Sequence, residues 1–412
     1  MDESKQRALW RRCGLPVRDR LESERTYLVR AVCLAPVSLR RSDNDGGELL
    51  SPPQWPAGEH SWPADALLRR VAYTAVRALY ALRLDAGEAE VALGGDGRVA
   101  LRRARPLGAA ELPQAVLEPL AEWYAASGGD PGRQSILLGA DPEFALLRPD
   151  GRLASAARFF GAGAAGATGA DALLVSRRLL YPVAELRPAP AADPAALAAN
   201  VLRLLLRAAA KVNDPSLRWV AGAMPVPGLA LGGHIHISGA PLTGRLLRCL
   251  DSCVAYPLAL VEDPAGRGRR PRYGGLGDFR YQPHGGFEYR TLPSWLIAPA
   301  AAKAAFALAL LCAREAHRLP RIPADDGRYA AAYYAGDRSE LAGCLDDIAS
   351  TISATESYSA LSVYIEPLLD AARQGKTWDE KLDFRHKWRI PLQAAPTDGM
   401  PTWSKGMLRT KE

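Results

Sequence analysis

The most specific local pattern in this chain is the run Gly232-Gly233-His234-Ile235-His236-Ile237. Residues two apart on a β-strand project from the same face of the sheet, so both imidazoles would share one face and both isoleucines the other. The two glycines allow another backbone or a ligand to approach closely. The run therefore predicts a strand with one buried, apolar face and one chemically active face.

Three further stretches repeat this spacing with charged groups. They are Asp141-Pro142-Glu143, Glu185-Leu186-Arg187 and Glu288-Tyr289-Arg290. If all four stretches share a sheet, one face carries four carboxylates, two imidazoles and two guanidiniums. Such a face cannot be a dry core, because desolvating charges is costly without partners or metal ions. The positions between the pairs would form the buried face: Phe144, Leu186, Ile235, Ile237 and Tyr289.

The chemistry of these groups indicates a site for a cation and phosphate. Clustered carboxylates either share protons or bind cations, and oxygen ligands select hard ions such as Mg²⁺ or Mn²⁺. Arg187 and Arg290 each stand two residues from a carboxylate and would suit phosphate oxygens beside a metal. Metal ions and arginines on one surface are what phosphoryl transfer requires. One pair alone is more typical of a solvated strand face, whereas four pairs together favour an active site.

Two other interpretations of these residues remain open. A zinc hydrolase also uses an H-x-H pair, but it needs further histidine ligands, and only His284, His317 and His386 follow in this chain. A binding or assembly protein could keep the same fold without catalysis, with the N-terminal region as its working part. The complete set of glutamates and histidines argues against a degenerate site.

A literal match to the dinucleotide-binding fingerprint lies at residues 161–166, Gly-Ala-Gly-Ala-Ala-Gly. That fingerprint needs a strand before it and a helix that opens on its last glycine. The following residues break a helix, so we interpret the run as part of a Gly/Ala-rich connection over residues 152–172. Such a loop could act as a lid over the site.

Five motifs occur in order along residues 135–320. They are Gly139-Ala140-Asp141-Pro142-Glu143-Phe144, Ala184-Glu185-Leu186-Arg187-Pro188, Gly232-Gly233-His234-Ile235-His236-Ile237, Arg269-Arg270 with Tyr273-Gly274, and Glu288-Tyr289-Arg290-Thr291-Leu292-Pro293-Ser294-Trp295. Together they resemble the phage-type COOH–NH2 ligases, the amidoligase type 2 branch of the superfamily that contains glutamine synthetase and glutamate–cysteine ligase.

The resemblance implies an α+β fold with a glutamine-synthetase-like curved antiparallel sheet and helices on its convex face. It implies that the concave face binds ATP and divalent metal ions, Mg²⁺ or Mn²⁺. The implied reaction activates a carboxylate as an acyl phosphate, which an amine then attacks to give an amide. The implied partners are a small-molecule or peptide carboxylate and an amine.

The resemblance also implies roles for individual residues. Glu143, Glu185, Glu288 and His234 correspond to the metal-binding residues, and Asp141 is a further acid in the first motif. His236 corresponds to a phosphate-side histidine, and Arg290 to the arginine after the last metal acid. Arg269 and Arg270 would face phosphate or the acyl intermediate. Independently of the resemblance, the position of Arg187 two residues from Glu185 leads us to expect it at the nucleotide phosphates.

The chain divides into three regions by its patterns. Residues 1–134 form an accessory region with a strand over 26–39, an amphipathic helix over 64–82 and a hairpin over 89–103 around Gly94-Gly95-Asp96-Gly97. Residues 135–320 form the catalytic core, in which Asp193 and Pro194 predict the start of a helix. Residues 321–412 are a helical extension, with a helical stretch over 339–374, and a tail.

Composition limits the class of protein. The chain has 412 residues, a net charge of +7 and a pI of about 9.1. No long Lys/Arg block is interleaved with aromatic residues, so we expect anionic small ligands rather than nucleic acid as partners. The six dispersed cysteines contain no C-x-x-C pair, and no secretory signal or membrane-length apolar run occurs, which favours the cytoplasm.

Overall fold

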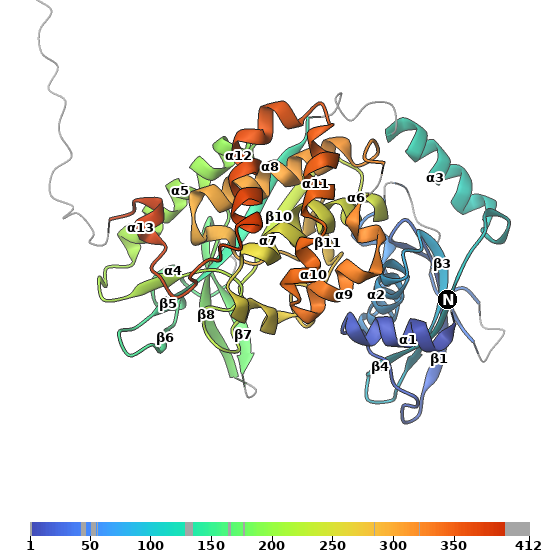
Figure 1. Cartoon of the computed structure of the whole chain (residues 1–412). Helices are drawn as coiled ribbons and strands as arrows, with labels where there is room; N and C mark the ends of the chain where they lie inside the picture. Colours follow the sequence, from blue (N-terminus) through green and yellow to red (C-terminus); the bar gives the residue numbers. More distant parts are fainter. Residues whose placement is uncertain are drawn as a thin grey trace, which may run out of the picture.

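The computed structural model describes residues 2–42, 47–50, 55, 57–127, 135–163, 166–175, 178–283, 285–320 and 322–391. The N-terminal region lies beside the larger part that is expected to be catalytic (the catalytic part), and the C-terminal helices pack over the latter (Figure 1). The structure confirms the α+β class, with a curved antiparallel sheet, helices on its convex face and a helical C-terminal part.

A four-stranded antiparallel sheet forms the N-terminal region, in the order β2-β1-β3-β4. Its elements are α1 (Glu3–Arg12), β1 (Arg25–Val32), β2 (Ala35–Arg41), α2 (Ala66–Ala81), β3 (Ala86–Leu93), β4 (Val99–Pro106) and α3 (Gln114–Ser127). The apolar face of α2 packs against β1, β3 and β4, and this packing forms the core of the region. The predicted helix over 64–82 and the predicted hairpin over 89–103 are both confirmed.

The single strand predicted over residues 26–39 is wrong. The chain reverses after Val32, and β1 and β2 pair as a hairpin. Cys33 and Leu34 both have positive φ, at 46° and 69°, as a two-residue hairpin turn requires. Because neither residue is Gly, Asn or Asp, the sequence gives no turn signal at this point.

The catalytic part is built on an eight-stranded sheet with the order β11-β12-β10-β5-β8-β7, in which β6 and β9 also pair with β5. The strands are β5 (Leu137–Leu147), β6 (Leu153–Ala154), β7 (Thr168–Val175), β8 (Arg178–Leu186), β9 (Arg218–Val220), β10 (Gly233–Ser238), β11 (Phe279–Tyr281) and β12 (Phe287–Tyr289). All pairings are antiparallel. The connection predicted over 152–172 is partly wrong, because residues 168–172 begin β7.

Helices cover one face of this sheet. The helices α5 (Pro194–Lys211) and α8 (Pro299–Glu315) pack against it, with α4 (Ala157–Phe160) beside α5, and α12 (Tyr358–Arg373) packs on α8. The face that they cover carries the apolar residues expected there, all of them buried: Phe144, Leu186, Ile235, Ile237 and Tyr289. Asp193 caps α5 as predicted, since its side chain accepts a hydrogen bond from the Ala196 N–H.

Further helices complete the catalytic and C-terminal parts. They are α6 (Gly244–Leu250), α7 (Tyr256–Val261), α9 (Gly327–Ala335), α10 (Arg338–Ala342), α11 (Leu345–Ser353) and α13 (Arg385–Trp388). The helical stretch predicted over 339–374 therefore consists of three helices rather than one. Across the described residues, no helix combines the length and apolar character needed to cross a membrane.

The segment before α13 returns to the catalytic part and is held there by buried hydrogen bonds. The Glu380 carboxylate accepts hydrogen bonds from the backbone N–H groups of Ala223, at 2.7 Å, and Met224, at 2.8 Å. Arg385 donates to the carbonyl of Leu217 and lies over the Trp219 ring. The C-terminal part is thus fastened to β9 and to the residues on either side of it.

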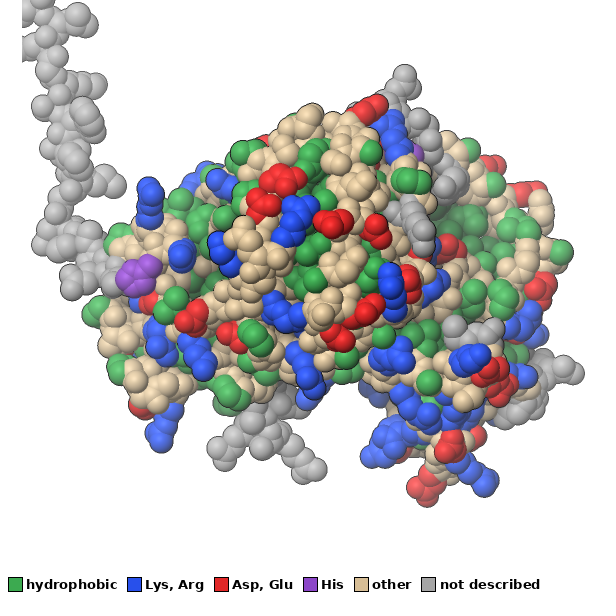
Figure 2. Space-filling model, in the orientation of Figure 1, with side chains coloured by type: hydrophobic (Ala, Val, Ile, Leu, Met, Phe, Trp, Pro, Cys, Tyr) green, Lys and Arg blue, Asp and Glu red, His purple; other side chains and the backbone are tan. Residues whose placement is uncertain are grey.

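On the face shown in Figure 2, Lys and Arg side chains are interspersed with Asp and Glu rather than gathered into one block. The net positive charge is therefore spread over this face. The expectation that nucleic acid is not a partner stays a prediction.

Candidate active site

Strand β10 brings its two histidines between the acids of its neighbours. It pairs with β5 on one side, where His234 lies opposite Asp141, and with β12 on the other, where His236 lies opposite Glu288. A glycine, Gly139, lies opposite His236 on β5, and a Cβ at that position would lie 3.3 Å from the His236 Cβ. The register therefore leaves room for the second imidazole on the active face.

Strand β8 brings Glu185 and Arg187 to the same face of the sheet. Glu185 lies opposite Glu143 of β5, so the two carboxylates are cross-strand neighbours. The Arg187 guanidinium donates to the Glu185 carboxylate and also to the carbonyl of Gly166, at 3.2 Å. Glu143 accepts a hydrogen bond from the Gly232 N–H at 2.6 Å.

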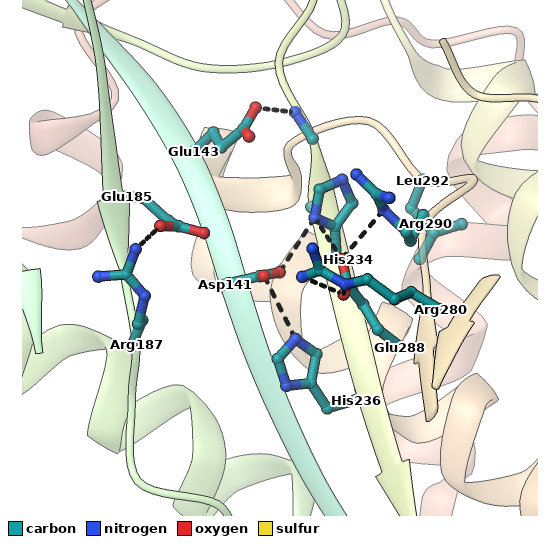
Figure 3. Close-up of polar contacts among 12 residues, drawn as sticks. Asp141, Glu143, Glu185, Arg187, His234, His236, Arg280, Glu288, Arg290 and Leu292 are labelled. Carbon is teal, nitrogen blue, oxygen red and sulfur yellow. Dashed lines mark hydrogen bonds and ion pairs between the residues drawn. The ribbon is translucent and has the colours of Figure 1, made fainter. Parts of the chain in front are cut away.

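All eight residues of the four pairs line one cavity of about 730 Å³. Both members of every pair therefore face one cavity, as the two-residue spacing predicted, although Arg187 and Arg290 each stand one residue beyond the end of a strand. Figure 3 shows their side chains facing one another across β5, β10 and β12. The residues are Asp141, Glu143, Glu185, Arg187, His234, His236, Glu288 and Arg290.

Three of these side chains form the tightest cluster. His234 Nδ1 lies 3.1 Å from Asp141 Oδ1 and 3.1 Å from Glu288 Oε1, and His236 Nε2 lies 3.3 Å from Asp141 Oδ2. One donor atom each from Asp141, His234 and Glu288 falls within 4.8 Å of the others. These atoms are buried, yet His234 Nδ1, Asp141 Oδ1 and Glu288 Oε1 make no hydrogen bond of normal geometry with the described residues. Buried polar atoms in this state need an explanation, and a cation between them would provide one.

The charges in this cluster perturb one another strongly. Burial disfavours the imidazolium, but the contacts with Asp141 and Glu288 outweigh it and raise the pKa of His234 to about 10. Burial likewise opposes ionisation of Asp141, but contacts with both imidazoles hold its pKa well below the usual range. A proton on His234 thus places positive charge between the carboxylates of Asp141 and Glu288.

The acids on the β8 side of the cavity are perturbed in the opposite direction. Burial, followed by repulsion from Asp141, raises the pKa of Glu185 to about 8 although Arg187 opposes the change. Burial also raises the pKa of Glu143. Raised pKa values of this kind are expected of carboxylates gathered at a metal site.

Arg280 belongs to the site, although the sequence patterns did not identify it. It lies opposite Glu288 in the pairing of β11 with β12, and its Nε donates to Glu288 Oε2 at 2.7 Å. The Arg290 Nε lies 3.1 Å from the other oxygen, Oε1. The run Phe279-Arg280-Tyr281 alternates as a strand does, which is the signal that could have placed Arg280 on the active face.

Arg269 and Arg270, which the resemblance places at phosphate or the acyl intermediate, do not line the cavity. Arg269 is 3% exposed and donates to the carbonyls of Thr291, at 2.9 Å, and Leu292, at 3.1 Å. Arg270 pairs with the buried carboxylate of Glu262. Both guanidiniums are used to hold the segment that follows β12 and the loop before β11.

The glycine-rich run at 161–166 does not have the context of a dinucleotide site. Gly161 follows the short helix α4, and Gly163 pairs with Ala170 of β7, so the run leads into a strand rather than a helix. Its rejection as a fingerprint is confirmed. The contact between Arg187 and the Gly166 carbonyl brings the end of the run to the cavity, but its role as a lid stays a prediction.

Comparison with known proteins gives one family. No curated protein matches the chain. A solved structure titled "Apo GmaS without ligand" is similar over 67% of this chain and 75% of its own, with 14% identity and a TM-score of 0.35, which is too low to support a statement about function. The family model described as "Phage phiEco32-like COOH.NH2 ligase-type 2" matches residues 138–390, more than half of the chain, so the protein belongs to this ligase family.

Proposed function

We propose that the protein is an ATP- and Mg²⁺-dependent carboxylate–amine ligase that works through an acyl phosphate. Membership of the family supports ligase activity. The dependence on ATP and Mg²⁺ and the acyl phosphate are our inference. The observation that carries it is the convergence of buried, unsatisfied donor atoms from Asp141, His234 and Glu288 beside two guanidiniums in one cavity.

The donor set fits a divalent cation. Asp141, Glu288 and His234 would hold one ion, and the cross-strand neighbours Glu143 and Glu185 would offer carboxylates to a second. Carboxylate oxygens with one imidazole suit Mg²⁺ or Mn²⁺, which are usually shared with substrate phosphates. A bound cation would supply charge neutralisation for the triphosphate.

The arginines would handle the phosphate oxygens. Arg280 and Arg290 hold their guanidiniums against Glu288, so their positions are fixed before a ligand arrives. Fixed donors stabilise developing charge without the cost of reorganisation. Arg187 and His236 would contact the phosphates from the other walls of the cavity.

The proposed reaction has two balanced steps. A carboxylate oxygen of the acid attacks the γ-phosphorus of ATP, the bond to the β,γ-bridging oxygen breaks, and ADP leaves. The amine nitrogen then attacks the acyl carbon, the carbon–oxygen bond to phosphate breaks, and phosphate leaves while the nitrogen loses a proton. The cavity contributes mainly positioning and electrostatic stabilisation to both steps.

The test is a screen of acids and amines with ATP and Mg²⁺, scored by the mass of new amides and by release of ADP and phosphate. The Glu288→Gln variant is the control, since it keeps the side-chain shape and removes a charge. ATP-dependent amide formation by the wild type alone would support the proposal. Partner binding that survives in the variant, with no amide from either protein, would instead indicate a binding protein.

A further inference from the structure

A second cavity of about 400 Å³ adjoins the active site, and the N-terminal region forms one of its walls. That wall consists of the short helical turn Glu59–Ser61, Trp62 and the first half of α2. The opposite wall is β11 of the catalytic part. The accessory region thus contributes directly to a space beside the reaction centre.

Two arginines connect the cavities. Arg280 and Arg290 line both the cavity of the acidic pairs and this second one. Their guanidiniums contact Glu288 on the active-site side (Figure 3). A molecule in the second cavity would therefore present one end to the same guanidiniums that border the candidate metal cluster.

The walls of the second cavity are aromatic. Trp62 and Tyr73 pack together with ring centroids 6.1 Å apart, and Phe279 and Tyr281 pack edge to face at 5.5 Å. Trp62 and Tyr73 are half-buried, so part of each ring is open to a ligand. Aromatic walls of this kind favour a flat, largely apolar group.

The charged groups of the cavity favour an anion. Four arginines line it against one carboxylate, Glu59, which pairs with Arg69 at 2.9 Å. Arg70 is exposed and donates to the carbonyl of Gly97 at 2.8 Å. Guanidiniums bind carboxylates strongly because two N–H groups can contact two oxygens at once.

The two walls are fastened together at the active site. The Tyr73 hydroxyl on α2 donates to Asp278 Oδ1 at 2.7 Å. The carbonyl of Asp278 accepts the backbone N–H of Arg290 at 2.9 Å. The position of α2 is thus linked through one residue to the backbone of a cavity arginine, so the pocket is preformed.

We propose, resting on the proposed ligase function, that this cavity binds the acid substrate, a carboxylic acid with a flat, apolar group. Its reacting carboxylate would lie at Arg280 and Arg290, and its flat group against the half-buried rings of Trp62 and Tyr73. The nucleotide would lie in the cavity that holds the metal-binding residues. Transfer of the γ-phosphoryl group requires donor and acceptor in line, and two cavities that meet at the same arginines provide this arrangement. The N-terminal region is then the part of the chain that selects the acid.

The test uses phenylacetate as the probe, with phenethylamine and phenylacetamide as probes of the same shape but different charge. Binding is measured by ligand-observed NMR without ATP, where a fragment of this size is expected to show a Kd of roughly 1–10 mM. The variants are Trp62→Ala, Arg70→Ala and Ala66→Trp, the last of which fills the cavity from an exposed helix position. Matched controls are Leu67→Ala, at an exposed position of α2 that does not line the cavity, and Arg207→Ala, an exposed arginine of α5.

Phenylacetate is expected to bind the wild type and both controls, and to bind each cavity variant at least about fivefold more weakly. The amine and the amide are expected to bind more weakly than the acid, and Mg-ATP is expected to bind Trp62→Ala as it binds the wild type. The inference is overturned if phenylacetate does not bind, if the variants bind it normally, or if Trp62→Ala loses Mg-ATP instead. Because neither ATP nor turnover is needed, these outcomes are separate from the amide screen that tests the ligase function.

Discussion

His234 Nδ1 lies 3.1 Å from Asp141 Oδ1, on the neighbouring strand, without a hydrogen bond of normal geometry between them. Glu288 approaches the same nitrogen from the other side of β10 at the same distance. The register of the sheet thus gathers three donor groups from three strands. The most direct consequence is that the cluster should bind a divalent cation.

Wild-type protein is expected to bind Mn²⁺, and Asp141→Asn is expected to weaken this binding by more than about tenfold because it removes one ligand charge. Electron paramagnetic resonance of free Mn²⁺ measures the affinity. Asp150→Asn makes the same chemical change in the exposed turn after β5 and is expected to bind as the wild type does. Equal affinity in Asp141→Asn and wild type would remove Asp141 from the site.

Gly232→Ala is expected to reduce turnover by about 100-fold or more by displacing the His234 ring. A Cβ at residue 232 would lie 2.4 Å from His234 Nε2, and 1 Å of misplacement at a reaction centre is enough for such a loss. Gly108→Ala is the control, since nothing lies within 4 Å of a Cβ there. Steady-state rates with the substrate pair found in the amide screen measure the effect, and normal turnover in Gly232→Ala would show that this ring need not stay in place.

Arg280→Ala is expected to lower kcat/KM for ATP by roughly 10- to 100-fold, because one charge-assisted contact to phosphate is lost. Arg280→Lys should recover only part of the loss, since an ammonium group cannot make the paired contacts of a guanidinium. Unchanged kinetics in Arg280→Ala would limit this residue to its ion pair with Glu288.

Arg270→Ala is expected to destabilise the fold by about 3–5 kcal/mol rather than to alter a phosphate contact, because it leaves the buried charge of Glu262 unpaired. Urea unfolding measures the change, and Arg272→Ala, an exposed neighbour, is the control. If Arg270→Ala were fully stable but inactive, the phosphate role expected from the sequence would be restored.

The shifted pKa of Glu380 predicts that the stability of the fold depends on pH. Burial, against the opposing backbone N–H groups, raises its pKa to about 7. A carboxyl group whose pKa is higher in the folded state than in the unfolded state binds its proton more tightly in the folded state. Its contribution to the free energy of unfolding is therefore complete below the unfolded pKa and is lost as the pH rises towards 7. The loss amounts to roughly 3 kcal/mol.

The measurement compares wild type with Glu380→Gln, which cannot ionise, by thermal unfolding between pH 4 and pH 8. Wild type is expected to lose stability relative to the variant as the pH rises through this window. Asp379→Asn changes the exposed neighbouring acid and should follow the wild type at every pH. A constant difference between wild type and Glu380→Gln would show that Glu380 stays ionised throughout.

Side-chain direction was predictable from the sequence because a strand has a strict two-residue period. The spacing of His234 and His236 fixed which face each residue occupies, and the buried alternates such as Ile235 followed from it. Strand neighbours are a tertiary property, so Arg280, which faces Glu288 across β11 and β12, was missed. The turn at Cys33 and Leu34 was missed because tertiary packing imposes positive φ on residues that do not favour it.

For the arginines, the position of a residue within a family motif predicted its location less well than the alternation of residues along a strand did. Arg290 directly follows β12, continues its alternation and reaches the cavity, whereas Arg269 stands in a short helical turn that directs it to the carbonyls of Thr291 and Leu292. Loop residues have no period from which a direction can be derived. Their placement had to come from the structure.

The central claim is that ATP activates a carboxylate as an acyl phosphate in the cavity of the four pairs. The most direct test supplies the acid substrate with both carboxylate oxygens labelled with ¹⁸O and analyses the released phosphate by mass spectrometry. The account predicts one ¹⁸O in each phosphate and one in each amide, with ADP as the nucleotide product. Unlabelled phosphate, or label that appears in AMP, would contradict it.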